Sequence, residues 1–83
     1  MTRAADVLWR RIRRTMAETL AVDEQDIGLE SSPETLPSWD STMHVSLVLA
    51  LEEDLGIRFS PDDAAEMLSA ELIYLIAKER SAR

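Results

Sequence analysis

Residues 39–57 read Trp-Asp-Ser-Thr-Met-His-Val-Ser-Leu-Val-Leu-Ala-Leu-Glu-Glu-Asp-Leu-Gly-Ile, and this stretch decides the fold. Asp40 or Ser38 can cap a helix that starts at residue 41, and Gly56 suits the left-handed position that ends one. Residues spaced three or four apart form its inner stripe: His44, Leu47 or Val48, Leu51 and Leu55, with Val45 adjoining. The stretch therefore predicts a helix over about 41–55. Ser41 lies at its N-terminus, where the helix dipole and free backbone N–H groups favour an attached phosphate.

Helix signals also dominate the rest of the chain, and no strand-like alternation is sustained. A helix is predicted over about 3–20, capped by Thr2, with an apolar stripe of Ala5, Leu8, Ile12, Met16 and Leu20. Ser60 and Pro61 start a short helix that ends near Leu68. Ser69 caps a last helix that runs to about Arg80, with a buried side made of Leu72, Ile73, Leu75 and Ile76. The fold class that this pattern predicts is all-α.

Residues 21–40 are predicted to form a long loop with a short helical turn at 32–35. Long loops in compact domains tend to be functional or disordered. Val22, Ile27 and Leu29 can pin this loop to the helices. We therefore expect an ordered loop that lies across them.

Length and composition limit the class of protein. The 83 residues predict a single domain over 1–83. The absence of cysteine excludes disulfides and thiolate metal sites, and one histidine makes a zinc or iron site unfavourable. No apolar run approaches the roughly 20 residues of a membrane span, and no secretory leader is evident, so we expect a cytoplasmic protein without membrane contact.

The net charge of −7 is unevenly distributed. Residues 1–20 carry +3 and residues 21–83 carry −10. The acidic part argues against a nucleic-acid partner, because contacts to phosphate supply much of that affinity. It favours partners with basic docking surfaces, and the alternative is that the charge serves only solubility.

The segment 36–59 resembles the acyl carrier proteins. It combines Leu-Pro-Ser-Trp-Asp-Ser, an amphipathic helix and Glu-Glu-Asp-Leu-Gly-Ile-Arg-Phe, and the similarity extends from about residue 8 to 76. The resemblance implies a four-helix bundle of three longer helices and one short one, with the long loop between helices 1 and 2. It implies a carrier and not an enzyme. Ser41 would hold a 4′-phosphopantetheine arm from coenzyme A that carries an acyl or aminoacyl thioester, and Asp40 would orient the site and help bind the transferase's metal-bound coenzyme.

The resemblance also implies partners for a monomeric shuttle: a phosphopantetheinyl transferase, a loading ligase for acyl or aminoacyl groups, and downstream acyl-processing enzymes. The predicted partner surface comprises Thr42, Met43, Leu49, Glu52, Glu53 and Asp54. Family members usually have leucine where this chain has Thr42, and fatty-acid carriers often have acids where it has Met43 and Ser46. These departures favour specialised over housekeeping fatty-acid metabolism.

Two alternatives follow from the same residues. A helical interaction or regulatory module could keep the fold without cargo, and Thr42 is its main support. A small hydrolase could use Ser41 and His44, but no third residue or glycine-rich oxyanion loop accompanies them. We expect His44 to be partly buried and hydrogen-bonded to the long loop. Trp39 is predicted to pack at the junction of loop and helix, with contact to the arm or its cargo as the alternative.

Overall fold

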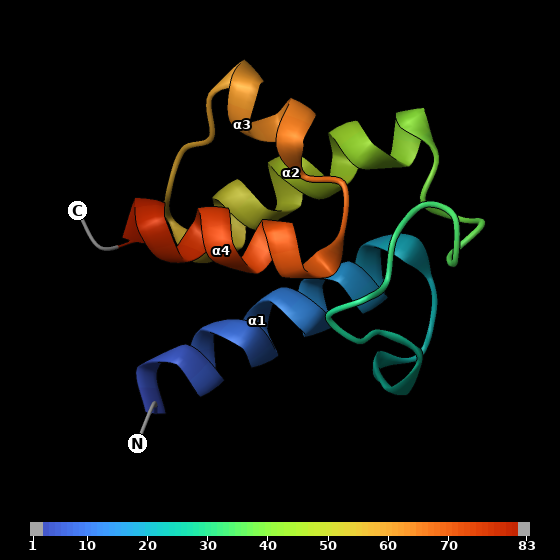
Figure 1. Ribbon diagram of the computed structural model, residues 1–83, viewed down its shortest axis with the longest axis horizontal. Helices are drawn as coiled ribbons and strands as arrows, with labels where there is room; N and C mark the ends of the chain where they lie inside the picture. Colours follow the sequence, from blue (N-terminus) through green and yellow to red (C-terminus); the bar gives the residue numbers. More distant parts are fainter. Residues whose placement is uncertain (1–2, 82–83) are drawn as a thin grey trace.

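The computed structural model describes residues 3–81, with side chains from residue 7 onward. Within these residues the elements are α1 (Arg3–Leu20), the 3₁₀ turn η1 (Glu24–Asp26), α2 (Ser41–Leu55), α3 (Pro61–Glu66) and α4 (Ala70–Ser81) (Figure 1). The predicted all-α class, the three longer helices, the one short helix and the long loop before α2 are confirmed. The predicted cap Thr2 and the side chain of Ala5 lie outside what the structure describes.

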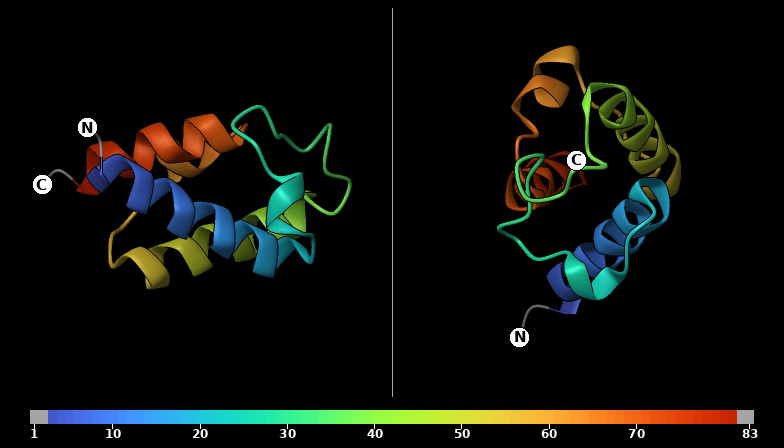
Figure 2. Two further views of the ribbon diagram at one scale, coloured as in Figure 1. Left: turned by 90° about the horizontal axis from the view of Figure 1, so that it is seen from below. Right: turned by 90° about the vertical axis from the view of Figure 1, so that its right-hand side faces the viewer.

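The helices are arranged around α1. This helix packs against both α2 and α4, while α3 lies on the far side of α2 and α4 from α1 (Figures 1 and 2). The long loop crosses one end of the bundle, and the start of α1 and the end of α4 lie at the other end. None of the helices within residues 3–81 has the length and apolar character needed to cross a membrane.

The core is built from the predicted stripes of α1 and α2. Side chains that are at most 1% exposed come from α1, α2, α4, the long loop and the segment between α3 and α4, among them Ile12, Met16, Leu20, Trp39, Leu47, Leu51, Met67 and Ile73. Ile27 of the long loop is also buried, and Val22 packs against the core, as predicted. The loop is therefore ordered by contacts with the helices.

Four apolar side chains that were predicted to be inside are exposed. Val45 is 60%, Leu72 38%, Leu75 48% and Leu29 44% exposed. Of the predicted buried side of α4, Ile73 is buried and Ile76 packs against the core, while the alanines Ala70 and Ala77 take the buried positions expected for the two leucines. Val45 lies outside the face that carries Leu47 and Leu51, so α2 buries a narrower stripe than predicted.

Leu29 fixes the loop through its backbone and not its side chain. Its carbonyl accepts a hydrogen bond from the Glu71 N–H at 2.9 Å, and the carbonyl of Ser31 accepts one from the Ala70 N–H at 2.9 Å. Both donors belong to the first turn of α4, where N–H groups have no partner inside the helix. The loop thus satisfies the start of α4 while it crosses the bundle.

Local signals set the ends of α3 and α4. Ser60 and Asp63 form a reciprocal capping box at the start of α3, with Pro61 as the first helical residue. Ser69 accepts a hydrogen bond from the Leu72 N–H at 3.1 Å, as its predicted capping role requires. The short helix ends at Glu66, before the predicted Leu68, because the buried Met67 leaves the helical conformation.

Gly56 ends α2 with φ at +67°, and a Cβ added there would meet no atom within 4 Å. Gly56→Ala is therefore expected to lower the free energy of unfolding by about 1–2 kcal/mol through backbone strain alone. Ala21 has a φ of +59°, so the reverse substitution Ala21→Gly relieves strain and should not destabilise the protein. Urea unfolding of both variants measures these changes. If Ala21→Gly lowered the free energy of unfolding as much as Gly56→Ala, backbone strain at Gly56 would not explain the loss.

Candidate functional site

Ser41 is the first residue of α2, and its side chain is exposed. Asp40 caps the helix: its Oδ1 accepts a hydrogen bond from the Met43 N–H at 2.8 Å, and its carbonyl accepts one from the His44 N–H at 2.8 Å. The N–H groups of Ser41 and Thr42 remain as the first-turn donors of α2 that no helical carbonyl can reach. They lie at the positive end of the helix dipole, which makes this helix end suitable for a phosphate on the Ser41 hydroxyl.

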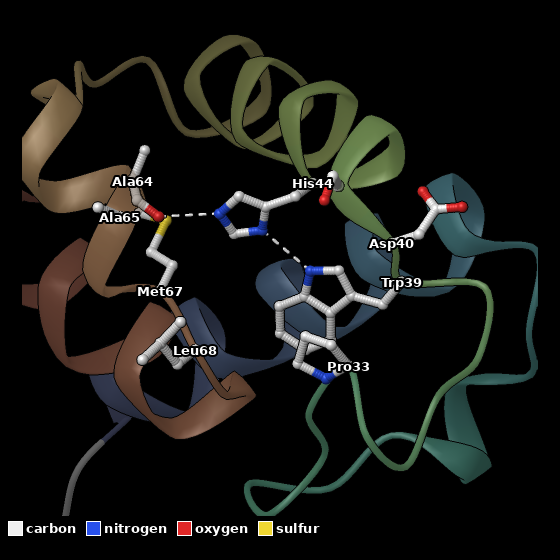
Figure 3. Close-up of a pocket in the computed structure, with 9 residues that line it drawn as sticks. Pro33, Trp39, Asp40, His44, Ala64, Ala65, Met67 and Leu68 are labelled. Atoms are coloured by element: carbon white, nitrogen blue, oxygen red, sulfur yellow. Dashed lines mark hydrogen bonds between the residues drawn. The ribbon is translucent and has the colours of Figure 1, made fainter.

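A mainly apolar hollow of about 420 Å³ lies beside Ser41 (Figure 3). Three parts of the chain build it: the long loop, the first turn of α2, and α3 with the segment that follows. Its lining residues are Pro33, Trp39, Asp40, Ser41, His44, Ala64, Ala65, Met67 and Leu68. The two alanines are small side chains on the α3 side of the hollow, and they leave this side open.

Trp39, His44 and Ala64 form one chain of hydrogen bonds along the hollow. The Trp39 Nε1–H donates to His44 Nδ1 at 2.9 Å, and His44 Nε2 lies 2.8 Å from the carbonyl oxygen of Ala64 (Figure 3). Because Nδ1 accepts, the ring is neutral and carries its proton on Nε2, which donates to Ala64. The predicted bond from a partly buried His44 to the long loop is confirmed, as is the packing role of Trp39, which is 1% exposed.

The hydrogen bonds of His44 also argue against the alternative of a hydrolase that uses Ser41 and His44. A general base must have a free ring nitrogen within hydrogen-bond reach of the serine hydroxyl. Both nitrogens of His44 are engaged elsewhere, one by Trp39 and the other by Ala64. The imidazole therefore fixes α2 relative to the loop and to α3, and it does not activate Ser41.

An ion pair between Asp63 and Arg80 holds α3 against α4. Asp63 accepts hydrogen bonds from Arg80 Nε at 2.8 Å and Nη2 at 2.7 Å, and from the Ser60 N–H at 3.0 Å. The Arg80 guanidinium, and then the Ser60 N–H, hold the pKa of the Asp63 carboxyl well below its usual range. This pair was not predicted from the sequence, although Arg80 continues the buried spacing of Ala70, Ile73 and Ala77.

The structure brings only part of the predicted partner surface together. Thr42, Leu49 and Glu53 are exposed at helical spacing on α2, and the exposed Val45 lies between them; we call these four residues the outer strip. The other three predicted residues make contacts within the domain, although Asp54 is still exposed. Met43 packs against the core, Glu52 accepts a hydrogen bond from the Phe59 N–H at 2.8 Å, and Asp54 accepts one from the Thr15 hydroxyl at 3.1 Å and pairs with Arg11.

Comparison with known proteins finds relatives that align with nearly the whole chain. No protein-family model matches the sequence. A protein of Treponema denticola named "Acyl carrier protein" is 33% identical over 75 residues, which cover 90% of this chain and 96% of that protein. The alignment thus spans nearly the whole of both chains.

Proposed function

The chain belongs to the acyl carrier protein family, whose members are carriers and not enzymes, and from this premise we propose that Ser41 is the attachment site of its 4′-phosphopantetheine arm. The single observation that supports Ser41 most is its position. Its exposed hydroxyl stands at the open end of α2, next to two unpaired first-turn N–H groups and at the edge of the hollow. These groups fit a phosphodiester and the first part of an arm.

Ser46, the other serine of α2, lacks this environment. It is exposed, but it lies in the second turn of the helix, where its N–H belongs to the helical hydrogen-bond ladder. A phosphate on Ser46 would find no free backbone donor and no dipole end. The two serines therefore form a matched pair for testing the assignment.

Asp40 has two parts in this proposal. Through its bond to the Met43 N–H it fixes the first turn of α2 and thereby the direction of the Ser41 hydroxyl. Its exposed carboxylate also lies close enough to the serine to help bind the metal-bound coenzyme of the transferase. The arm itself supplies the terminal thiol for thioester formation, which this cysteine-free chain does not have.

The outer strip supports a role in specialised metabolism, with acyl or aminoacyl cargo. Near Ser41 it offers Thr42, Val45 and Leu49, which carry no charge, and its acidic residue Glu53 lies at the far end. The partners would then bind a mainly uncharged surface with one acidic end. These partners are a phosphopantetheinyl transferase, a loading ligase and downstream acyl-processing enzymes. Met43 and Glu52 contribute less to docking in this proposal, because their partly buried side chains are engaged within the domain. The exposed Asp54 adds a second acid beside Glu53 at the far end of the strip.

Intact mass spectrometry after incubation with coenzyme A and a broad-specificity phosphopantetheinyl transferase tests the proposal. The wild type and Ser46→Ala are each expected to gain one phosphopantetheine, and Ser41→Ala is expected to gain none. Full modification of Ser41→Ala would move the site elsewhere. No gain in the wild type with several transferases would contradict a carrier role on Ser41 and favour the interaction module without cargo.

A further inference from the structure

We propose that the outer face of α1 binds an acidic segment of a partner protein, in which carboxylates lie next to an apolar side chain. This face carries a hollow of about 440 Å³, which we call the arginine hollow; it is lined by Val7, Arg10, Arg11, Arg14 and Glu24. The inference does not depend on an arm at Ser41. It adds a second kind of partner, because the outer strip of α2 offers an acidic end and no basic residue.

Four of the lining residues share one face of α1. Val7, Arg10 and Arg14 are three or four residues apart, and Arg11 adjoins them, so their side chains leave the helix on the same side. The opposite side carries Ile12, which is fully buried. The three arginines are exposed, and Val7 is 52% exposed. The hollow therefore presents three positive charges and one apolar side chain to solvent.

Two of the arginines in α1 serve the fold. Arg11 Nη2 donates a hydrogen bond to the carbonyl oxygen of Asp54, and its Nε lies 3.8 Å from the Asp54 carboxylate. Arg13 Nε donates a hydrogen bond to the carbonyl oxygen of Glu24 at 2.7 Å. These contacts tie α1 to the end of α2 and to η1, and they fix the walls of the arginine hollow.

Folding does not explain Arg10 and Arg14 in the same way. They lie four residues apart, and two like charges at this spacing lower the stability of a helix slightly. Arg14 lies 3.7 Å from Glu18, but both side chains are 72% exposed, and such surface pairs contribute little. The domain thus gains little stability from this pair of arginines, and binding of an acidic partner gives them a role.

The chemistry of the arginine hollow selects its occupant. A guanidinium can hold a carboxylate with two parallel hydrogen bonds, and Arg10 and Arg14 present two such groups one helical turn apart. Val7 adds an apolar contact, and Glu24 accommodates a positive charge beside the acids. A protein segment that combines acidic and apolar side chains offers groups for all of these contacts.

Extended polyanions fit this face less well. Residues 21–83 carry −10, and this charge repels nucleic acid and anionic membranes, which are too large to approach the arginines alone. A helix that binds a membrane surface also carries several large apolar side chains on one face, whereas the arginine hollow has Val7 as its apolar residue. A short protein segment can contact the arginines without meeting the acidic part of the chain.

The arginine hollow lies away from Ser41. It shares no lining residue with the hollow beside that serine. The start of α1 and the start of α2 lie at opposite ends of the bundle (Figures 1 and 2). A partner bound at the arginine hollow therefore leaves Ser41 accessible, and it can hold this protein in place while other proteins reach the serine.

Titration of the full chain with short acidic peptides, followed by nuclear magnetic resonance, tests the inference. The probes are capped hexapeptides with two Glu and one Leu in every order and Gly elsewhere, and a second set has Gln in place of Glu. The glutamate peptide that binds most tightly is expected to shift the amide signals of residues 7–14 and of Glu24, and its Gln counterpart should leave them unchanged. No shift at these residues with any glutamate peptide, or equal shifts with the Gln set, would overturn the inference.

Two variants with the same change in net charge make the test residue-specific. Arg10→Gln is expected to weaken peptide binding about two- to fivefold, because one carboxylate loses its guanidinium. Lys78→Gln is the matched control: Lys78 is exposed on α4, outside the arginine hollow, so binding should change by less than about 1.5-fold. Equal weakening in both variants would show that the peptide responds to net charge and not to this site.

Three further readouts exclude other roles for the arginines. The urea midpoint of Arg10→Gln is expected to match that of the wild type, and a much lower midpoint would show that Arg10 serves the fold. Tighter binding through the same amides to a DNA duplex or to vesicles of phosphatidylglycerol and phosphatidylcholine would contradict a protein partner. Self-association in sedimentation velocity that Arg10→Gln abolishes would overturn the inference as well, since the occupant would then be a second copy of this chain.

Discussion

Replacing Trp39 with alanine is expected to lower the free energy of unfolding by about 3–5 kcal/mol. The side chain is 1% exposed, so its removal leaves a cavity among the buried residues of the core. His44 Nδ1 also loses its donor, which adds the penalty of a partly buried acceptor without a partner. A domain of this length has a total stability of roughly 4–12 kcal/mol, so the loss is a large share of the whole.

Urea unfolding followed by far-ultraviolet circular dichroism measures this loss, and two variants separate its causes. Trp39→Phe keeps an aromatic ring but not the N–H. Its free energy of unfolding is expected to be about 1–2 kcal/mol lower than that of the wild type. Trp9→Ala is the matched control. Trp9 is only partly buried and meets the edge of Tyr74 with ring centroids 6.2 Å apart. A loss in Trp9→Ala that equals or exceeds the loss in Trp39→Ala would refute the assigned role of Trp39.

The position of α2 could be predicted from the sequence because its end signals are local. The observed bounds Ser41–Leu55 agree with the predicted range of about 41–55. Asp40 accepts the Met43 N–H at one end, and Gly56 takes the left-handed conformation at the other. Each signal involves residues no more than four apart, so no knowledge of the tertiary structure is needed. The placement of Ser41 at a helix N-terminus follows from the same signals.

Which face a helix buries was less predictable. Leucine at 72 and 75 is more apolar than alanine at 70 and 77, yet the alanines are buried and the leucines exposed. Periodicity identifies apolar positions but does not measure how closely two backbones approach. Alanine carries a weaker apolar signal than leucine, so the prediction placed Ile73 and Ile76 correctly toward the core but chose Leu72 and Leu75 in place of the buried alanines.

The hollow and its hydrogen bonds depend on contacts between distant segments. His44 accepts a hydrogen bond from Trp39, five residues away, and a hydrogen bond between His44 and the long loop was predicted without its partner residue. Its second bond goes to Ala64, 20 residues away, and the ion pair of Asp63 with Arg80 spans 17 residues. These contacts form only when α3 lies beside both α2 and α4, which it meets through Ala64 and Asp63 respectively. The sequence therefore predicted the position of Ser41 at a helix N-terminus but not the wall of the hollow beside it.

Hydrogen bonds and an ion pair hold α3 in position. A helix of six residues is too short to be stable in isolation, so it depends on these contacts. The capping box fixes its start, His44 holds the Ala64 carbonyl, and Arg80 holds Asp63 with two hydrogen bonds. The Asp63 side chain is 8% exposed, so this ion pair is shielded from water more than a surface pair. Asp63 is accordingly the residue of α3 whose charge should matter most for stability.

Asp63→Asn is expected to lower the free energy of unfolding by about 2 kcal/mol near neutral pH, since the carboxylate that pairs with the Arg80 guanidinium becomes an uncharged amide. The difference should depend on pH in a defined direction. Arg80 and the Ser60 N–H hold the pKa of Asp63 below its ordinary value of 3.8. A group with a lowered pKa stabilises the fold above its unfolded pKa, and this contribution is lost as the pH falls below that value.

The stability difference between wild type and Asp63→Asn should therefore be constant from neutral pH down to about pH 5 and then decrease toward pH 3. Urea midpoints at several pH values measure it, and all other titratable groups are shared by the two proteins. Asp62→Asn is the matched control: Asp62 is an exposed neighbour in the same first turn, so a change of at most about 0.5 kcal/mol is expected. A difference for Asp63→Asn that stays unchanged down to pH 3 would show that the Asp63 charge does not hold α3 in place.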